Sequence, residues 1–196
     1  MSTRARLLLL LAIGTVAIGF TYNAVRTRDE PQQYASAEVH FLYGSIGSEA
    51  ESGIPYWIWA VLPEVFPDLL AARTPGRDHL EGYERLGFID GPTVEEGGID
   101  LGKYPRPMGT SIRVTQIPML GLNCAACHVG TVRTPDGTED LLVLGMPAQQ
   151  LDFLAYERFI LDAVNDPRFT ADVLIDAIRL KNPAFSFLDR LLYRYV

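Results

Sequence analysis

The sequence predicts a mainly α-helical domain with one short β-hairpin, preceded by a single apolar helix at the N-terminus. Three observations support this prediction. An uncharged stretch runs from Leu7 to Val25, a turn sequence lies between two short apolar runs within 131–145, and three helical patterns follow within 148–196. With 48% hydrophobic and 21% charged residues, the composition is that of a globular chain.

The N-terminal stretch has the length of a membrane span. Arg4 and Arg6 precede it, and its 19 uncharged residues end before Arg26. At about 1.5 Å per residue they form about 28 Å of helix, close to the thickness of a bilayer core. We favour an uncleaved anchor over a cleaved signal peptide, whose apolar region Leu7–Phe20 would also fit. A buried core helix fits the basic flanks poorly, so we expect the rest of the chain to be exported.

Charge and composition divide the chain further. Residues 1–28 form the anchor or signal segment, the polar residues 29–38 a linker, and residues 39–196 one domain. There are 17 Lys and Arg against 24 Asp and Glu, a net charge of −7, without a basic run. Binding to phosphates needs clustered Lys and Arg, so we expect no nucleic-acid partner.

The first half of the domain is rich in helix breakers. Val39–Ile46 is apolar enough for a buried helix or strand, and residues 55–66 predict a helix that Pro63 kinks or ends. Many Gly and Pro residues within 73–109 predict a long irregular excursion with at most one helical turn, near His79.

The second half predicts a hairpin and then helices. Thr131–Arg133 and Leu141–Leu144 flank the turn-forming Pro135-Asp136-Gly137. No stop signal ends the last helix, so we expect the domain to continue past Val196. The three helices are predicted over Ala148–Val164, Thr170–Leu180 and Asn182–Val196.

One motif, Cys124-Ala125-Ala126-Cys127-His128, carries recognisable chemistry. Cysteines at i and i+3 lie on one side of a helical turn, so each thiol can add across one vinyl group of a haem. His128 can then bind the iron as the proximal ligand, and Asn123 can cap the turn. Behind an export segment the motif predicts one covalently bound haem c, and hence a cytochrome-like helical domain.

Three other interpretations of the two cysteines are weaker. A redox dithiol would need a thioredoxin-like βαβ context, which the sequence does not suggest. A zinc site would need a fourth ligand, but no second C-x-x-C or H-x-x-x-H is present. A disulfide between Cys124 and Cys127 is rare at this spacing.

The distal side of the haem has several candidate ligands. Met146 is favoured, because it directly follows the hairpin, which can fold back over the ring and deliver its sulfur. His40 lies in an apolar stretch and is expected to be a satisfied core residue instead. An iron left open to a small molecule is the alternative. The other candidates are Met108, Met119 and His79.

The remaining side chains have simpler roles. Tyr56, Trp57 and Trp59 can line a haem pocket, but a core aromatic cluster is the favoured interpretation. Arg113 and Arg133 flank the motif and can pair with haem propionates, or can be solvated surface charges.

Three pairs of stretches look familiar together: Tyr43–Glu49 with Gly53–Trp57, Gly109–Arg113 with Gly121–His128, and Gly145–Ala148 with Leu151-Asp152. Over roughly residues 39–190 the sequence resembles bacterial membrane-anchored or periplasmic c-type cytochromes, distantly similar to dihaem rubber-oxygenase and dihaem peroxidase-like proteins. The resemblance implies haem thioethers at Cys124 and Cys127 and an iron ligand at His128. Such relatives are usually longer and carry a second C-x-x-C-H, which this sequence lacks.

These observations together predict one-electron transfer at the periplasmic face of the bacterial inner membrane, or in the periplasm if the first segment is cleaved. The expected partners are redox proteins of the periplasm or membrane, and the lipid bilayer. The alternative function is the N-terminal haem part of a dihaem oxygenase or peroxidase-like enzyme with an open distal face.

Overall fold

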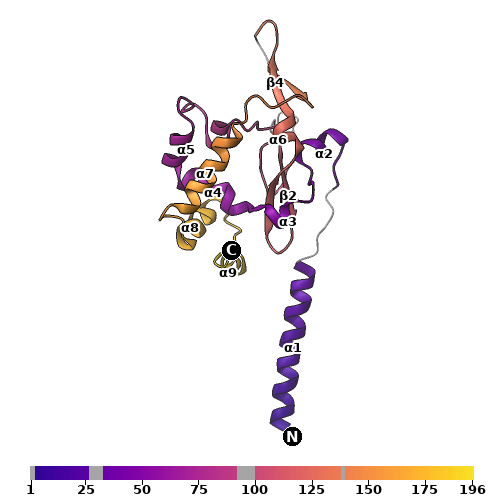
Figure 1. Cartoon of the computed structure of the whole chain (residues 1–196). Helices are drawn as coiled ribbons and strands as arrows, with labels where there is room; N and C mark the ends of the chain where they lie inside the picture. Colours follow the sequence, from indigo (N-terminus) through magenta and orange to yellow (C-terminus); the bar gives the residue numbers. More distant parts are fainter. Residues whose placement is uncertain (1–2, 27–32, 92–99, 138–139) are drawn as a thin grey trace.

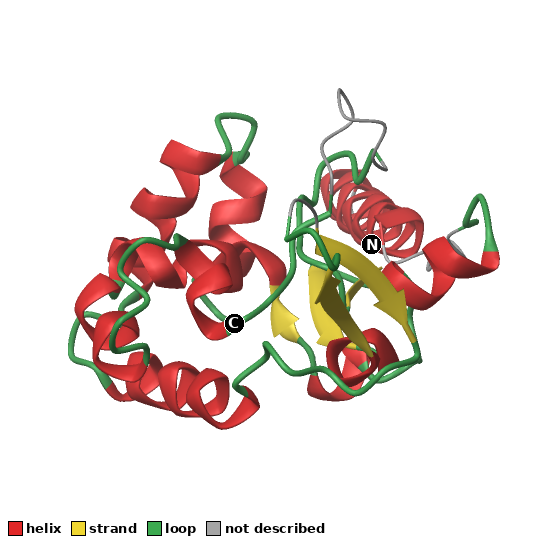
Figure 2. Cartoon of the chain, turned by 90° about the horizontal axis from the view of Figure 1, so that it is seen from above, coloured by secondary structure: helices red, strands yellow, loops and turns green. Residues whose placement is uncertain are grey.

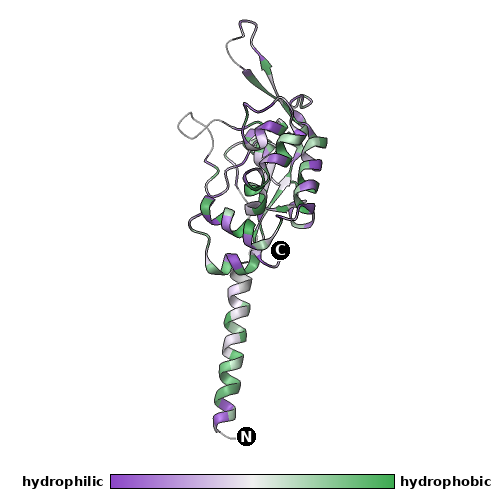
Figure 3. Ribbon diagram, turned by 90° about the vertical axis from the view of Figure 1, so that its left-hand side faces the viewer, coloured by the Kyte–Doolittle hydropathy of each residue, from purple (hydrophilic) through white to green (hydrophobic). Residues whose placement is uncertain are grey.

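The computed structural model describes residues 3–26, 33–91, 100–137 and 140–196. Its first helix, α1 (Thr3–Arg26), extends away from all other elements (Figure 1). Residues Thr3–Tyr22 are long and apolar enough to cross a membrane, and none of this stretch is buried against the protein. Figure 3 shows α1 as mostly hydrophobic with a hydrophilic N-terminal end. The predicted apolar helix is therefore present, and its properties fit a membrane span or a signal sequence.

Behind α1, most of the helices gather on one side of the strands (Figure 2). The first helices, α2 (Ala37–Tyr43) and α3 (Glu49–Ser52), lie against the strands instead. The Ser36 side chain caps α2 by accepting a hydrogen bond of 3.2 Å from the Val39 amide. The predicted linker 29–38 lies partly outside the described residues, and its last two residues already belong to α2.

A three-stranded antiparallel sheet lies next to α3, in the order β1-β3-β2. It consists of β1 (Ile54–Pro55), β2 (Thr110–Val114) and β3 (Pro118–Leu122). The prediction of a single hairpin was therefore wrong, because this second sheet was missed. The physical reason lies in β3, where Pro118 and Gly121 look like breakers in the sequence. Pro118 is the first residue of its strand, a position that tolerates proline.

The helical side is built from six further elements, some of which begin or end away from the predicted positions. Pro63 lies inside its helix, which ends two residues later. The single turn expected near His79 lies further along, at residues 82–86. The elements are α4 (Tyr56–Val65), α5 (Pro67–Arg73), the 3₁₀ helix η1 (Gly82–Leu86), α7 (Phe153–Asn165), α8 (Ala171–Lys181) and α9 (Phe187–Tyr193).

Capping residues explain where the last three helices begin. Asp152 accepts a hydrogen bond of 2.9 Å from the Ala155 amide, so α7 starts five residues later than predicted. Thr170 caps α8, as predicted. Ser186 forms a capping box with Asp189, so α9 starts after it and not at residue 182. The helix ends at Tyr193, before Val196.

The main core lies between these helices and the sheet. Leu62, Phe66 and Phe159 are fully enclosed in it, and α4 packs against α8 while α5 packs against α7. Tyr56 and Trp59 are also buried there, as expected of a core cluster, while Trp57 is only partly buried and packs against the core.

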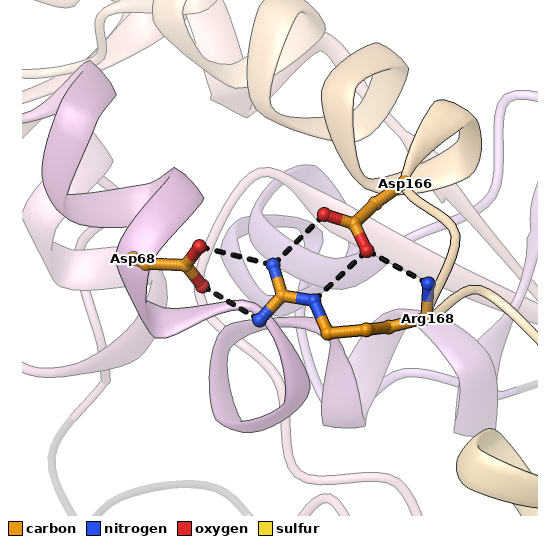
Figure 4. A network of polar contacts seen from close by, with 3 residues as sticks. All are labelled: Asp68, Asp166 and Arg168. Atoms are coloured by element: carbon orange, nitrogen blue, oxygen red, sulfur yellow. Dashed lines mark hydrogen bonds and ion pairs between the residues drawn. The ribbon is translucent and has the colours of Figure 1, made fainter.

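A charged clamp at the surface joins α5 to the loop between α7 and α8 (Figure 4). The Arg168 guanidinium donates two hydrogen bonds to Asp68, of 2.9 and 3.0 Å, and binds Asp166 at the same time. Hydrogen bonding to Arg168 holds the pKa of Asp166 down to about 2 and also lowers the pKa of Asp68.

Candidate functional site

The C-x-x-C-H motif forms α6 (Cys124–His128), one short helix between two strands. It follows β3 after a single residue and leads directly into β4 (Val129–Arg133). The Asn123 side chain caps it by accepting a hydrogen bond of 2.9 Å from the Ala125 amide, as predicted. A strand on each side fixes both ends of the motif.

Asn123 also ties the motif to α2. Its side-chain amide nitrogen donates hydrogen bonds to the carbonyls of Leu42, at 3.2 Å, and Gly44, at 3.0 Å. Its backbone N–H donates to the Gly109 carbonyl at 3.0 Å. Asn123 is buried, so these bonds satisfy groups that water cannot reach.

Gly109 supports α6 from behind, a structural role that the sequence did not indicate. Its φ of +83° lies in the left-handed region, and a Cβ placed there would lie 2.5 Å from the Ala126 Cα. Only glycine allows the chain to pass this close behind α6 in this conformation. In the sequence, Gly109 is only a glycine that directly precedes an apolar strand pattern. Many turns have a glycine in this position, so the signal is not specific.

The motif helix has an inner and an outer side. Ala125 and Ala126 are buried, 2% and 7% exposed, whereas Cys124, Cys127 and His128 are exposed. Residues at i, i+3 and i+4 share a helix face, so the two thiols and the imidazole leave the protein on the same side. Both thiols are free in the structure.

Beside the motif stands the predicted hairpin, β4 paired with β5 (Asp140–Leu144). Its first pair, Val129 opposite Leu144, is adjacent to α6. A two-stranded hairpin is only marginally stable alone in water, so an apolar group that covers it would stabilise it. Four apolar side chains of the hairpin are exposed, namely Val132, Leu141, Leu142 and Leu144.

The segment after the hairpin folds back onto the motif. The Gly145 amide donates a hydrogen bond of 2.8 Å to the His128 carbonyl, and the Ala148 amide donates one of 2.9 Å to the Cys127 carbonyl. Met146 between them lies over Gly130, where a Cβ would be 3.2 Å from the methionine sulfur. The hairpin thus returns to the motif as expected, and Met146 lies beside the strand that follows His128.

The other distal candidates lie elsewhere. Met108 is buried behind α6 with Ala125 and Val129, and Met119 packs against the main core from β3. His79 is exposed in a turn. His40 is exposed too, with its ring stacked on Tyr34 at 4.7 Å, so the expectation of a core residue was wrong.

The two arginines proposed for the propionates differ in setting. Arg133 is exposed at the end of β4 and pairs with Asp140 at 3.4 Å. Arg113 lies in β2 and acts electrostatically on Glu49. The structure therefore brings Arg133, but not Arg113, to the hairpin.

A fully enclosed carboxylate supports the strand that leads into the motif. Glu49 is 0% exposed and accepts hydrogen bonds from Ser45, at 2.6 Å, and from Ser111. Burial opposes its ionisation, but the two serines, assisted by Arg113, outweigh burial and hold the pKa of Glu49 below its ordinary value. Gly121 in β3 leaves the space for this side chain, since a Cβ there would lie 2.8 Å from the Glu49 Cγ.

Among the described residues, no three His, Cys, Asp or Glu side chains converge so as to hold a bare metal ion. Comparison with models of protein families, with curated proteins and with solved structures finds no match to the chain in any of the three. The resemblance to c-type cytochromes therefore stays a prediction from the motif and its neighbouring residues.

Proposed function

We propose that this chain is a c-type cytochrome that binds one haem c through Cys124 and Cys127 and carries out one-electron transfer. The observation that supports this most strongly is the outer side of α6. There two free thiols and one imidazole are exposed together on a helix whose other residues are buried. Haem c, when bound, supplies an iron that takes up and gives back one electron.

Each residue of the motif would have its own role in haem binding. Each thiol would add its sulfur and hydrogen across one vinyl group, which fixes the ring to the helix at two points. The imidazole of His128 would bind the iron from the same turn. The bonds of Asn123 and Gly109 hold this turn from behind, so the two thiols and the imidazole would be positioned before haem arrives.

The surroundings fit an apolar ring as well. Leu144 of β5 lies beside the motif, opposite Val129, and the exposed Leu142 follows on the same strand face, so covering these two side chains would remove apolar surface from water. Met146 is the distal ligand that we propose, because two backbone hydrogen bonds hold its segment to the carbonyls of the motif itself. A thioether on the iron would raise the reduction potential relative to a second imidazole.

The position of the site suggests how electrons would enter and leave. The hairpin and α1 lie at opposite ends of the molecule (Figure 1). If α1 crosses the inner membrane, the motif faces away from the bilayer and toward the periplasm. We therefore propose a soluble or projecting redox protein as the partner, docking at this far end.

The experiment is expression of the full chain in cells that attach haem c, with the Cys124→Ala/Cys127→Ala variant as control. A pyridine haemochrome spectrum of the purified wild type should show haem c, and the double variant should show none. Carbon monoxide then separates carrier from enzyme: slow or no binding supports the carrier, and rapid binding to five-coordinate ferrous haem supports an oxygenase or peroxidase.

A further inference from the structure

A hollow lies away from the motif, between α8 and α9. It has a volume of about 560 Å³. Two arginines and one carboxylate meet three apolar side chains in it. The lining residues are Asp176, Arg179, Leu180, Pro183, Phe185 and Arg190.

No carboxylate among the described residues pairs with the Arg190 guanidinium. Its Nε is buried and has no hydrogen-bond partner. The guanidinium lies 5.9 Å from the centre of the Phe187 ring. Because a buried charged donor without a partner is costly, the hollow favours an anionic ligand with acceptor oxygens.

Arg179 provides a second positive charge in the same hollow. Its contact with Asp176 is long, at 3.7 Å, and both side chains are more than half exposed. Such an exposed pair contributes little, so Arg179 can turn toward a stronger acceptor. Two guanidinium groups around one hollow are suited to a phosphate, whose oxygens accept several charge-assisted hydrogen bonds.

Two exposed apolar side chains lie at the hollow: Leu180 lines it, and Phe187 lies against the Arg190 guanidinium. A free phosphate would leave both uncovered. Leu180 is 87% exposed and Phe187 is 69% exposed. Further exposed apolar side chains follow in and after α9, namely Leu188, Leu191, Tyr195 and Val196. A ligand that fits both parts of this surface would have a charged group for the hollow and apolar chains for the exposed side chains, so it would be an amphiphile.

The place of α9 in the molecule identifies the amphiphile. In Figures 1 and 3 the C-terminus lies at the end of the domain from which α1 extends. If α1 spans a bilayer, this end of the domain faces the lipid headgroups. We infer that the hollow between α8 and α9 binds the phosphate of an anionic phospholipid through Arg190 and Arg179, with its acyl chains against Leu180 and Phe187. The inference rests on the proposed membrane location and is independent of haem.

The test is a titration of the full chain, held in a neutral maltoside detergent, with soluble short-chain phosphatidylglycerol, followed by isothermal calorimetry. We expect saturable binding. The variant Arg190→Gln should weaken it about tenfold, as expected for a lost charge-assisted hydrogen bond, and Arg190→Lys should retain part of it. Arg158→Gln, an exposed arginine of α7, is the matched control and should bind like the wild type.

Two outcomes would overturn the inference. One is equal affinity of the Arg190→Gln variant and the wild type, with both showing the same thermal unfolding. The other is inorganic phosphate binding as tightly as the lipid, which would indicate a simple anion site. Haem content is read separately from the visible spectrum, so a chain without haem still tests the hollow, and a failed titration leaves the haem proposal standing.

Discussion

The amide of Gly145 donates a hydrogen bond of 2.8 Å to the carbonyl of His128. This contact joins the residue after β5 to the last residue of α6, so it closes the base of the hairpin at the motif. The expected iron ligand and the segment that carries Met146 are therefore coupled through the backbone. A substitution that shifts the His128 backbone should therefore also shift the segment that carries Met146.

Replacing His128 by Ala should abolish the low-spin haem spectrum, because the imidazole that we assign to the iron is lost. The optical spectrum of the purified ferrous protein is the measurement. His79→Ala and His40→Ala remove exposed histidines outside the motif and should leave the spectrum unchanged. A low-spin spectrum that survives in the His128 variant would overturn the ligand assignment.

Replacing Met146 by Ala should lower the reduction potential and speed carbon monoxide binding, because the iron loses its proposed sulfur ligand. Redox titration of wild type and variant measures the shift. Met119→Ala is the control, because that methionine packs against the main core from β3. An unchanged reduction potential in the Met146 variant would mean that Met146 does not bind the iron and only packs over Gly130.

Gly109→Ala should destabilise the protein by about 2 kcal/mol or more, because it combines a left-handed backbone with a clash against Ala126. Gly47→Ala separates the two causes: its φ of +91° is similar, but nothing lies within 4 Å of the new Cβ. Chemical denaturation of both variants is the check. Equal losses would mean that the close approach to α6 does not matter.

The clamp of Asp68, Arg168 and Asp166 should make stability depend on acid. The pKa of Asp166 is lowered to about 2 in the folded protein, against about 3.9 for an unperturbed Asp. A lowered pKa stabilises the fold above the unfolded value, and this contribution is lost as the pH falls from about 4 to about 2. Between pH 6 and pH 2 the denaturation midpoint should therefore fall less steeply in Arg168→Gln than in the wild type. The midpoint of Arg158→Gln should follow the wild type. Parallel curves for Arg168→Gln and wild type would argue against the clamp.

The sequence predicted local features well and tertiary ones poorly. The hairpin, the Thr170 cap and the Asn123 cap follow from short-range rules, and all three are present. The sheet of β1, β2 and β3 was missed because its pairing joins Ile54 to Leu120, 66 positions further along the chain. Such pairing leaves no periodic signal in a strand that contains Pro and Gly.

In the candidate site, too, the local features could be predicted and the tertiary contacts could not. Three residues of one motif could be named from spacing alone, because C-x-x-C-H is a single helical turn. The buried support of Glu49 by Ser45 and Ser111 could not, since it needs residues from α3 and β2 to meet. His40 was misjudged for the reverse reason: its neighbours are apolar, but α2 turns it outward.

The central claim is a covalent bond between a porphyrin and α6, and the mass of the intact polypeptide tests it most directly. The chain should be produced in cells with haem c attachment machinery and measured under denaturing conditions. We predict a mass increase of one haem in the wild type and no increase in Cys124→Ala/Cys127→Ala. A wild-type chain that carries no added haem, while a known c-type cytochrome made in the same cells does, would contradict the proposed function.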